Sequence, residues 1–150
     1  MLLTEIVDWE RARAEAGPIR FVVFVDEQKV PAEIELDEFD AVSLHVIART
    51  DGRAVGTGRL LPAEAGGTSH IGRMAVCKEF RAQGAGAAML LALIEAAHAR
   101  GDKAIVLSAQ IQAVGFYLRF GFVAEGGIFM DAGIEHQSMR KVLQAVERSS

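Results

Sequence analysis

The sequence has few of the residues that build cross-links, metal clusters or nucleic-acid surfaces. Its single cysteine, Cys77, cannot form an internal disulfide or a cysteine-based metal cluster, and we expect no bound metal. Four lysines, no basic stripe and a net charge of −4 argue against a nucleic-acid partner held by phosphate neutralisation. No segment approaches the ~18 apolar residues of a membrane span, and the first residues lack the basic start of a secretory signal. We therefore expect a cytoplasmic protein that binds neither nucleic acid nor membrane.

The composition is that of an ordinary globular protein. Apolar residues make up 51% of the chain and charged residues 24%, spread along the sequence rather than in blocks. A length of 150 residues is common for one domain and is sufficient to bury a core. We expect a single domain that spans residues 1–150.

The first part of the chain is predicted to be helical and then irregular. Residues 8–28 mix apolar and charged side chains, and Gly17-Pro18 interrupts them, so we expect two short helical pieces with a break between them. Residues 27–40, EQKVPAEIELDEFD, carry a proline and five carboxylates after Glu27, which is typical of a solvated surface loop.

The rest of the chain alternates strands with helices. Asp51-Gly52 between two β-rich runs predicts a hairpin, and the Ala- and Leu-rich run that follows Gly84 predicts a long helix that stops at Gly101. The predicted strands are 43–50, 53–61, 70–76, 103–109 and two within 126–142, with a short helix in 111–121 and turns at Gly126-Gly127 and 131–133. This order predicts an α/β fold, an α+β mixed sheet packed by N-terminal helices and one long central helix.

Two loops share the spacing R-x-x-G-x-G. RAVGTG, residues 53–58, continues into RLLP without a helix, so its glycines are expected inside a strand, where they allow a bulge or a close neighbour. RAQGAG, residues 81–86, has a strand before it and a strong helix after it. The free N–H groups and positive dipole of a helix start favour pyrophosphate, and glycine lets its oxygens approach the backbone. We therefore expect the second loop to bind a phosphate-containing ligand.

Two common nucleotide sites are disfavoured. A dinucleotide fingerprint requires a third glycine where this chain has Met89, and an acidic residue after the next strand, which closes in Ser108. A P-loop requires Gly-Lys-Ser or Gly-Lys-Thr, which the loop lacks.

The segment IGRMAVCKEFRAQGAGAAML, followed by AQIQAVGFYLRFGF, resembles the acetyl-CoA-binding core of the GNAT superfamily of N-acyltransferases. The core spans about residues 71–123, and the flanking order of elements also fits. EQKVP and the later GIEHQSM further resemble a small bacterial branch of that superfamily whose substrates are mostly unassigned. The resemblance implies the GNAT fold and an N-acetyltransferase that moves an acetyl group from acetyl-CoA to a small amine by direct attack in a ternary complex.

The same resemblance implies a cofactor site. The pyrophosphate would lie on residues 81–87, and the pantetheine arm would pair with the backbone of residues 74–76 like an added strand. Gln110 stands where many relatives have an asparagine that contacts pantetheine. The implied cofactor-binding residues are Met74, Ala75, Val76, Arg81, Ala82, Gln83, Gly84, Ala85, Gly86, Ala87, Gln110, Phe116 and Tyr117.

The resemblance also implies catalytic roles. Tyr117 matches the family's general acid, and a backbone N–H near Met74 or Ala75 would hold the oxyanion. Many relatives use a glutamate base on the strand before the loop, which this chain lacks. A histidine suits that role near neutral pH. His136 is the first candidate for the base, followed by His70 and then His45, and His98 is expected to be structural.

Arg73, Arg20 and Phe24 are the residues expected to line the acceptor site, with Arg73 as a possible ligand for an anionic acceptor. Cys77 as an acyl-carrying nucleophile is a second route. A non-catalytic acyl-CoA sensor or interaction module with the same fold is the alternative function. The amine, the acyl length and the oligomeric state stay open, with a homodimer as a possibility.

Overall fold

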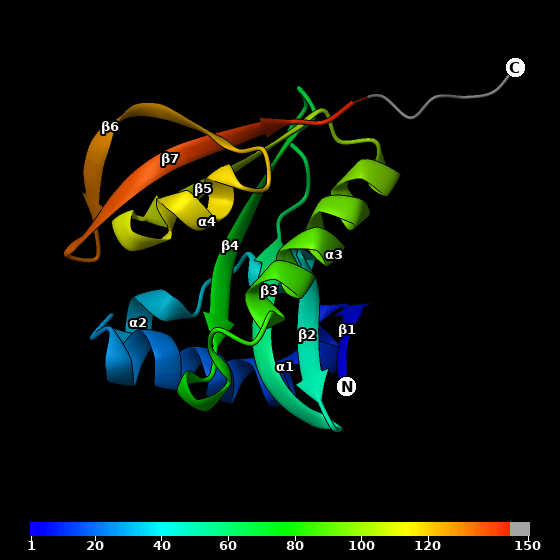
Figure 1. The fold of residues 1–150 in the computed structure, drawn as a ribbon, viewed down its shortest axis with the longest axis vertical. Helices are drawn as coiled ribbons and strands as arrows, with labels where there is room; N and C mark the ends of the chain where they lie inside the picture. The colour runs from blue at the N-terminus through cyan, green and yellow to red at the C-terminus, as the bar shows by residue number, and fades with distance from the viewer. Residues whose placement is uncertain (145–150) are drawn as a thin grey trace, which may run out of the picture.

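The computed structural model describes residues 1–144, in which seven strands form one mixed sheet (Figure 1). The strands are β1 (Leu2–Val7), β2 (Leu44–Thr50), β3 (Arg53–Leu60), β4 (Thr68–Val76), β5 (Ala104–Gln110), β6 (Val123–Asp131) and β7 (Ile134–Val142). Their order across the sheet is β1-β2-β3-β4-β5-β7-β6. Every neighbouring pair is antiparallel except β4 and β5, which run parallel.

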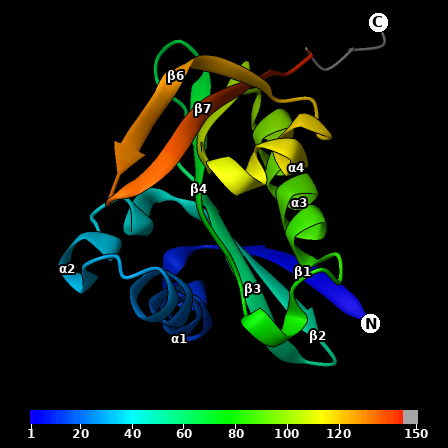
Figure 2. The ribbon, with the colours of Figure 1, turned by 60° about the vertical axis from the view of Figure 1, so that its left-hand side comes forward.

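Helices cover both faces of the N-terminal half of the sheet. They are α1 (Trp9–Arg20), the π-helix η1 (Phe21–Glu27), α2 (Ala32–Glu35), α3 (Ala85–Arg100) and α4 (Val114–Leu118), with short 3₁₀ turns η2 (Asp40–Val42), η3 (Lys78–Phe80) and η4 (Ile111–Ala113). The two views show α3 on one face of β1–β4 and α1 on the other (Figures 1 and 2). None of the helices in residues 1–144 is long and apolar enough to cross a membrane. The mixed α/β fold predicted from the sequence is confirmed.

The long helix is specified by its own sequence. It runs between Gly84 and Gly101, which both adopt left-handed backbone angles (φ +91° and +88°) that glycine accepts without strain. The inward face of α3 presents Met89, Leu90 and Leu93, all fully buried in the main core. The predicted start and stop of this helix are thus where the structure has them.

Four details of the sequence prediction are wrong. α1 does not break at Gly17-Pro18 but continues through Pro18 to Arg20. The π-helix η1 follows it directly, and wider turns of this kind accommodate an irregularity in the hydrogen-bond ladder, such as the hydrogen bond that proline cannot donate. Residues 2–7, LLTEIV, form the edge strand β1, which was not predicted from the sequence. Gly126-Gly127 lies within β6 at a register shift, so it forms a bulge instead of a turn. Residues 27–40 are not a fully solvated loop, since they contain α2 and two buried carboxylates.

The parallel pair β4 and β5 separates soon after it forms. The strands pair only at Thr68↔Ala104, Ser69↔Ile105 and His70↔Val106. Beyond His70, β4 continues beside β3, and β5 continues beside β7, so the sheet opens into a wedge (Figure 1). In the described part of the chain, no strand fills this wedge, and the edge of β4 that faces it is left without a strand partner. An extended ligand can pair with such an edge.

Candidate active site

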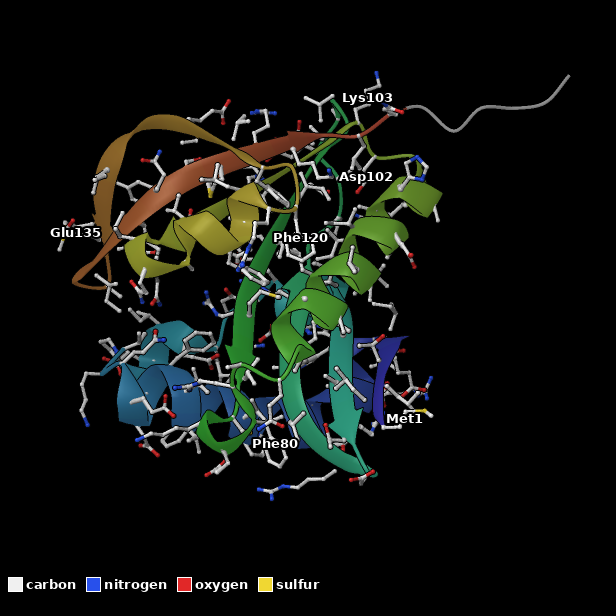
Figure 3. The ribbon with its side chains drawn as sticks, in the orientation of Figure 1. Met1, Phe80, Asp102, Lys103, Phe120 and Glu135 are labelled. Carbon is white, nitrogen blue, oxygen red and sulfur yellow. The ribbon has the colours of Figure 1, made fainter. Side chains whose placement is uncertain are left out.

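A cavity of about 690 Å³ fills the wedge between β4 and β5. Its walls come from η1 and α2, from β4 and β5, from α4, and from the β6–β7 turn. Figure 3 shows Glu135 near that turn and Phe80 just beyond the C-terminal end of β4. The lining includes Phe24, Gln28, Arg73, Met74, Gln110, Tyr117 and His136. The structure therefore brings only part of the predicted cofactor set, Met74, Gln110 and Tyr117, to one cavity with the predicted base and two predicted acceptor residues. The other predicted cofactor residues are not in this lining: Ala75, Val76, Arg81, Ala82, Gln83, Gly84, Ala85, Gly86, Ala87 and Phe116.

The RAQGAG loop connects the foot of β4 to the start of α3. Ala82 (φ +61°) and Gly84 (φ +91°) turn the chain so that α3 begins at Ala85. A Cβ added at Gly86 would lie 3.7 Å from the Phe116 ring on α4, so this glycine faces the gap between α3 and α4. The loop thus leads into a helix N-terminus that lies beside Phe116 of α4, and such a helix end attracts anions.

Arg81 has partners within the protein. Its Nε donates to the carbonyl of Val76 at 2.9 Å, and its Nη2 donates to Glu27 Oε2 at 2.5 Å. Both side chains of the ion pair keep contact with solvent, with 43% of Arg81 and 27% of Glu27 exposed. The guanidinium is therefore held at the foot of β4 and stays accessible from outside.

The RAVGTG loop is a packing element, as predicted. Gly56 and Gly58 lie in β3 under α3, and a Cβ at Gly56 would lie 2.9 Å from Met89 Sδ and 3.2 Å from the Ala75 carbonyl oxygen. A Cβ at Gly58 would lie 2.5 Å from Met74 Sδ. These glycines therefore allow the long helix to approach the sheet.

β4 bulges where it lines the cavity. Thr57 pairs with Ala75 and Arg59 pairs with Gly72, so two β4 residues, Arg73 and Met74, oppose a single residue of β3. Arg73 takes a left-handed backbone angle (φ +52°), which is rare and strained for a residue with a side chain. A bulge re-aims backbone and side chains, and it is common beside active sites.

Tyr117 on α4 reaches the cavity from the side of β5. Only 9% of the residue is exposed, and its ring packs edge-on against Phe116 and Phe122. Phe120, just beyond α4, adds to the same aromatic cluster, and Figure 3 shows it between α4 and α3. Burial raises the pKa of Tyr117 to about 12. The hydroxyl therefore stays protonated across the physiological range.

His136 on β7 also lines the cavity. It is 8% exposed, stacks on Phe129, and has Nδ1 2.8 Å from the carbonyl oxygen of Ile134. A carbonyl only accepts hydrogen bonds, so Nδ1 carries the hydrogen, and in the neutral ring Nε2 keeps its lone pair. His136 thus has the tautomer that a base needs.

The other three histidines differ in their surroundings. His70 lines the same cavity, with its Nε2 3.2 Å from Glu64 Oε1. His45 is 1% exposed behind the cavity and bonds the Asp40 carbonyl through Nε2, and burial lowers its pKa. His98 bonds the Gln144 carbonyl at the far end of α3. His70 therefore stays an alternative base, whereas His45 does not reach the cavity.

The expectation that Arg20 lines the acceptor site is wrong. Arg20 is 1% exposed and donates to Glu35 Oε1 at 2.5 Å and to Asp40 Oδ1 at 2.7 Å. Arg59, from β3, donates to Asp40 Oδ1 at 2.9 Å and to both Asp37 carboxylate oxygens. Removing charges from water is costly unless each is paired, and each of these charges has an oppositely charged partner, although the buried Nε of Arg59 has no hydrogen-bond partner among the described residues. The network thus fixes residues 35–40 against the sheet.

Arg73 joins this network from the cavity side. It donates to the carbonyls of Ile34 and Glu35 at 3.2 and 3.1 Å and to Asp37 Oδ2 at 3.3 Å. Burial and the neighbouring arginines lower its pKa. Its charge is already engaged with α2 and the segment after it, so its role toward an acceptor stays a prediction. Phe24 does line the cavity, as expected for a wall residue.

Several residues at the cavity were not predicted from the sequence. Gln28, at the end of η1, accepts a hydrogen bond from Gln110 Nε2 at 2.8 Å, and Arg59 and Glu35 form part of the lining. The EQKVP motif was the signal available for Gln28. Nothing in the sequence marked Arg59, because its partners lie about twenty positions away in the chain.

Cys77 lies outside the main cavity. It lines a second hollow of about 580 Å³ between α1 and β3, and burial together with Glu79 raises the pKa of its thiol. A raised pKa disfavours the thiolate that a nucleophile requires. Among residues 1–144, no group of three or more His, Cys, Asp or Glu side chains could hold a metal ion.

Comparison with known proteins agrees with this geometry. The chain is 38% identical over 133 residues to the uncharacterised N-acetyltransferase YjcF of Bacillus subtilis, covering 88% of this chain and 94% of that protein. The structure superposes on an acyl-CoA N-acyltransferase from Pseudomonas aeruginosa with a TM-score of 0.84 at 30% identity, covering 94% of this chain and 99% of that one. It shares its fold with Escherichia coli ElaA at 23% identity and a TM-score of 0.84, again covering 94% and 99% of the two chains. Residues 12–143 match the family model described as an acetyltransferase (GNAT) domain. The chain therefore belongs to the GNAT family of acetyltransferases.

Proposed function

We propose that the protein is an acetyl-CoA-dependent N-acetyltransferase that acetylates a small amine by direct attack in a ternary complex. The observation that carries this proposal is the wedge between β4 and β5, whose cavity is lined by Met74, Gln110 and Tyr117, together with the glycine-rich loop that follows β4 and begins α3. The pyrophosphate of acetyl-CoA would lie on residues 81–87. The pantetheine arm would pair with the free edge of β4 at residues 74–76 and reach Gln110 on the other wall.

The thioester would sit at the closed end of the wedge, next to the β4 bulge. A backbone N–H at Met74 or Ala75 is the donor that we assign to the thioester carbonyl and to the oxyanion of the tetrahedral intermediate. A preorganised donor of this kind stabilises charge that develops only in the transition state. The strain at Arg73 fits a backbone held in one orientation for this purpose.

Proton transfers would involve two residues that line the cavity. Nε2 of His136 would take a proton from the amine nitrogen as the N–C bond forms. Tyr117 would donate its proton to the sulfur as the C–S bond breaks. A tyrosine with a pKa of about 12 is a weak acid, but the same burial also raises the basicity of a thiolate that is released into the cavity. The two groups thus suit a cycle that leaves free CoA and an amide.

The first test is calorimetric titration with acetyl-CoA, CoA and NAD, using wild-type protein and Arg81→Glu. Arg13→Glu is the matched control, because Arg13 is an exposed arginine on α1 far along the chain from the loop. We expect binding of acetyl-CoA and CoA but not NAD, weakened in the first variant and unchanged in the control. Absence of CoA binding in the wild-type protein would refute the proposal.

The second test separates an enzyme from a non-catalytic acyl-CoA sensor. Release of free thiol from acetyl-CoA would be followed across a panel of small amines, with wild-type protein and with Tyr117→Phe. Amine-dependent thiol release that collapses in the variant, while acetyl-CoA still binds, supports the enzyme. Tight binding without turnover of any amine, and indifference to the Tyr117 substitution, would instead indicate a sensor.

A further inference from the structure

The end of η1 touches both walls of the cofactor wedge. Glu27 accepts a hydrogen bond from Arg81 Nη2 at 2.5 Å, and Gln28 accepts one from Gln110 Nε2 at 2.8 Å. Arg81 follows β4, whereas Gln110 ends β5. Two adjacent residues of the EQKVP motif therefore bond to side chains on the two sides of the wedge, one in the loop after β4 and one at the end of β5. Both of these side chains are ones that we assign to the cofactor.

The backbone of this turn is well fixed. The N–H groups of Gln28 and Lys29 donate to carbonyls of η1 at 3.2 Å, and that of Val30 donates to the Phe24 carbonyl at 2.8 Å. Lys29 takes a left-handed backbone angle (φ +61°) that ends the helix. The position of the Glu27 carboxylate next to Arg81 is therefore set by the fold of this turn.

We propose that Glu27 competes with the pyrophosphate of CoA for Arg81 and thereby sets how fast CoA leaves. This inference rests on the proposed function, in particular on a pyrophosphate bound at residues 81–87. In the structure, Arg81 forms an ion pair with Glu27. When a pyrophosphate arrives, two anions share one guanidinium, so the carboxylate occupies a donor of Arg81 and part of its charge, both of which the pyrophosphate would otherwise use.

Competition between Glu27 and the pyrophosphate would speed the release of the product CoA during turnover. Acetyl-CoA and CoA carry the same pyrophosphate, so every interaction with that group holds the product as firmly as the substrate. Product release limits the rate of many enzymes, and uniformly tighter binding does not raise kcat. A carboxylate that pairs with Arg81 again after the reaction shortens the residence time of CoA. Glu27 is in this view a positioning residue, since it acts through Arg81.

The experiment compares Glu27→Gln with wild type in CoA and acetyl-CoA titrations and in stopped-flow displacement of bound CoA. Glutamine keeps the shape and one acceptor oxygen but removes the charge. We expect both Kd values to fall by about two- to fivefold, the range typical of a partly exposed ion pair, through slower dissociation. Thermal unfolding checks that each variant stays folded, which we expect because the Glu27 side chain is 27% exposed.

Two controls make the test specific. Glu79→Gln removes a charge from a residue that lines the same second hollow as Glu27 but does not bond Arg81 through its side chain. In an Arg81→Gln background, Glu27→Gln should not change the Kd of CoA further, because the guanidinium for which the two anions compete is gone.

Tighter CoA binding in Glu27→Gln that exceeds the Glu79→Gln effect and disappears without Arg81 supports the inference. Unchanged or weaker binding, an effect equal to that of Glu79→Gln, or an effect that persists without Arg81 overturns it. Failure of the wild-type protein to bind CoA is a different result, which overturns the proposed function itself.

Discussion

Gly86→Ala separates the role of the RAQGAG loop in binding from its role in folding. Gly86 is the second residue of α3, and an added Cβ would meet the Phe116 ring at 3.7 Å, an ordinary van der Waals distance. The protein therefore has room for the methyl group. Because alanine favours helix over glycine, the free energy of unfolding should stay the same or rise by up to about 1 kcal/mol. For a chain of this size, that is a rise in Tm of up to about 4 °C.

Binding should change in the opposite direction. The methyl group would enter the gap between α3 and α4, where the proposal places the phosphates, and it would keep their oxygens from the backbone N–H groups. We expect the Kd of acetyl-CoA to rise at least about tenfold, equivalent to about 1.4 kcal/mol. Isothermal titration and thermal unfolding on the same preparation measure both effects.

Gly56→Ala in the other loop is the matched control. Its Cβ would lie 2.9 Å from Met89 Sδ and 3.2 Å from the Ala75 carbonyl oxygen, so the close approach of α3 to β3 would be disturbed. Overpacking of this kind costs about 1–3 kcal/mol. We expect lower stability, with acetyl-CoA affinity of the folded protein within about threefold of wild type. If Gly86→Ala bound acetyl-CoA as well as wild type, the loop would be only a helix start, and the reasoning would be refuted.

Three further predictions concern catalysis and stability. Tyr117→Phe should lower kcat by roughly 10²- to 10⁴-fold with the Kd of acetyl-CoA unchanged, and a retained kcat would remove Tyr117 from the mechanism. Cys77→Ser should keep full activity, because the raised thiol pKa disfavours the nucleophile, and inactivation would point back to an acyl-cysteine route. Burial lowers the pKa of His45 in the folded protein below its unfolded value of 6.5. As the pH falls through 6.5, the imidazole is therefore protonated in the unfolded chain before it is protonated in the folded one, and the free energy of unfolding decreases. In denaturant titrations from pH 7 to pH 5, His45→Gln should therefore lose less stability than wild type, and parallel curves would contradict this assignment.

The sequence predicts the parts of this fold that depend on local signals. The hairpin at Asp51-Gly52 and the helix between Gly84 and Gly101 are confirmed, because turn chemistry and helix stops act within a few residues. The separation of β4 from β5 could not be derived from composition or periodicity. It depends on how β7 pairs with β5 along its length, which is a property of the assembled sheet.

The carboxylates of residues 27–40 show where local reading fails. A proline with several acidic residues is typical of a solvated loop, yet Glu35 and Asp40 are 5% and 3% exposed. Arg20 and Arg59, which pair with them, come from α1 and β3 and meet them only in the folded chain. Charge can be buried when partners from distant segments satisfy it, and no pattern within the loop reveals those partners.

The same contrast explains why the sequence indicates the acyl donor better than the acceptor. The proposed pyrophosphate and pantetheine contacts fall mostly within residues 74–87, where backbone groups of one strand, one loop and one helix start follow each other in the chain. The acceptor side, the part of the cavity expected to take the acceptor, is lined by η1, α2, β4, β5 and the β6–β7 turn, and Arg59 joins the segment after α2 to β3 through Asp37. A change in any of those segments can reshape that side without altering the loop that would hold CoA. Acceptor preference should therefore follow the contacts between these segments, and it is best sought by varying amines against the intact cavity.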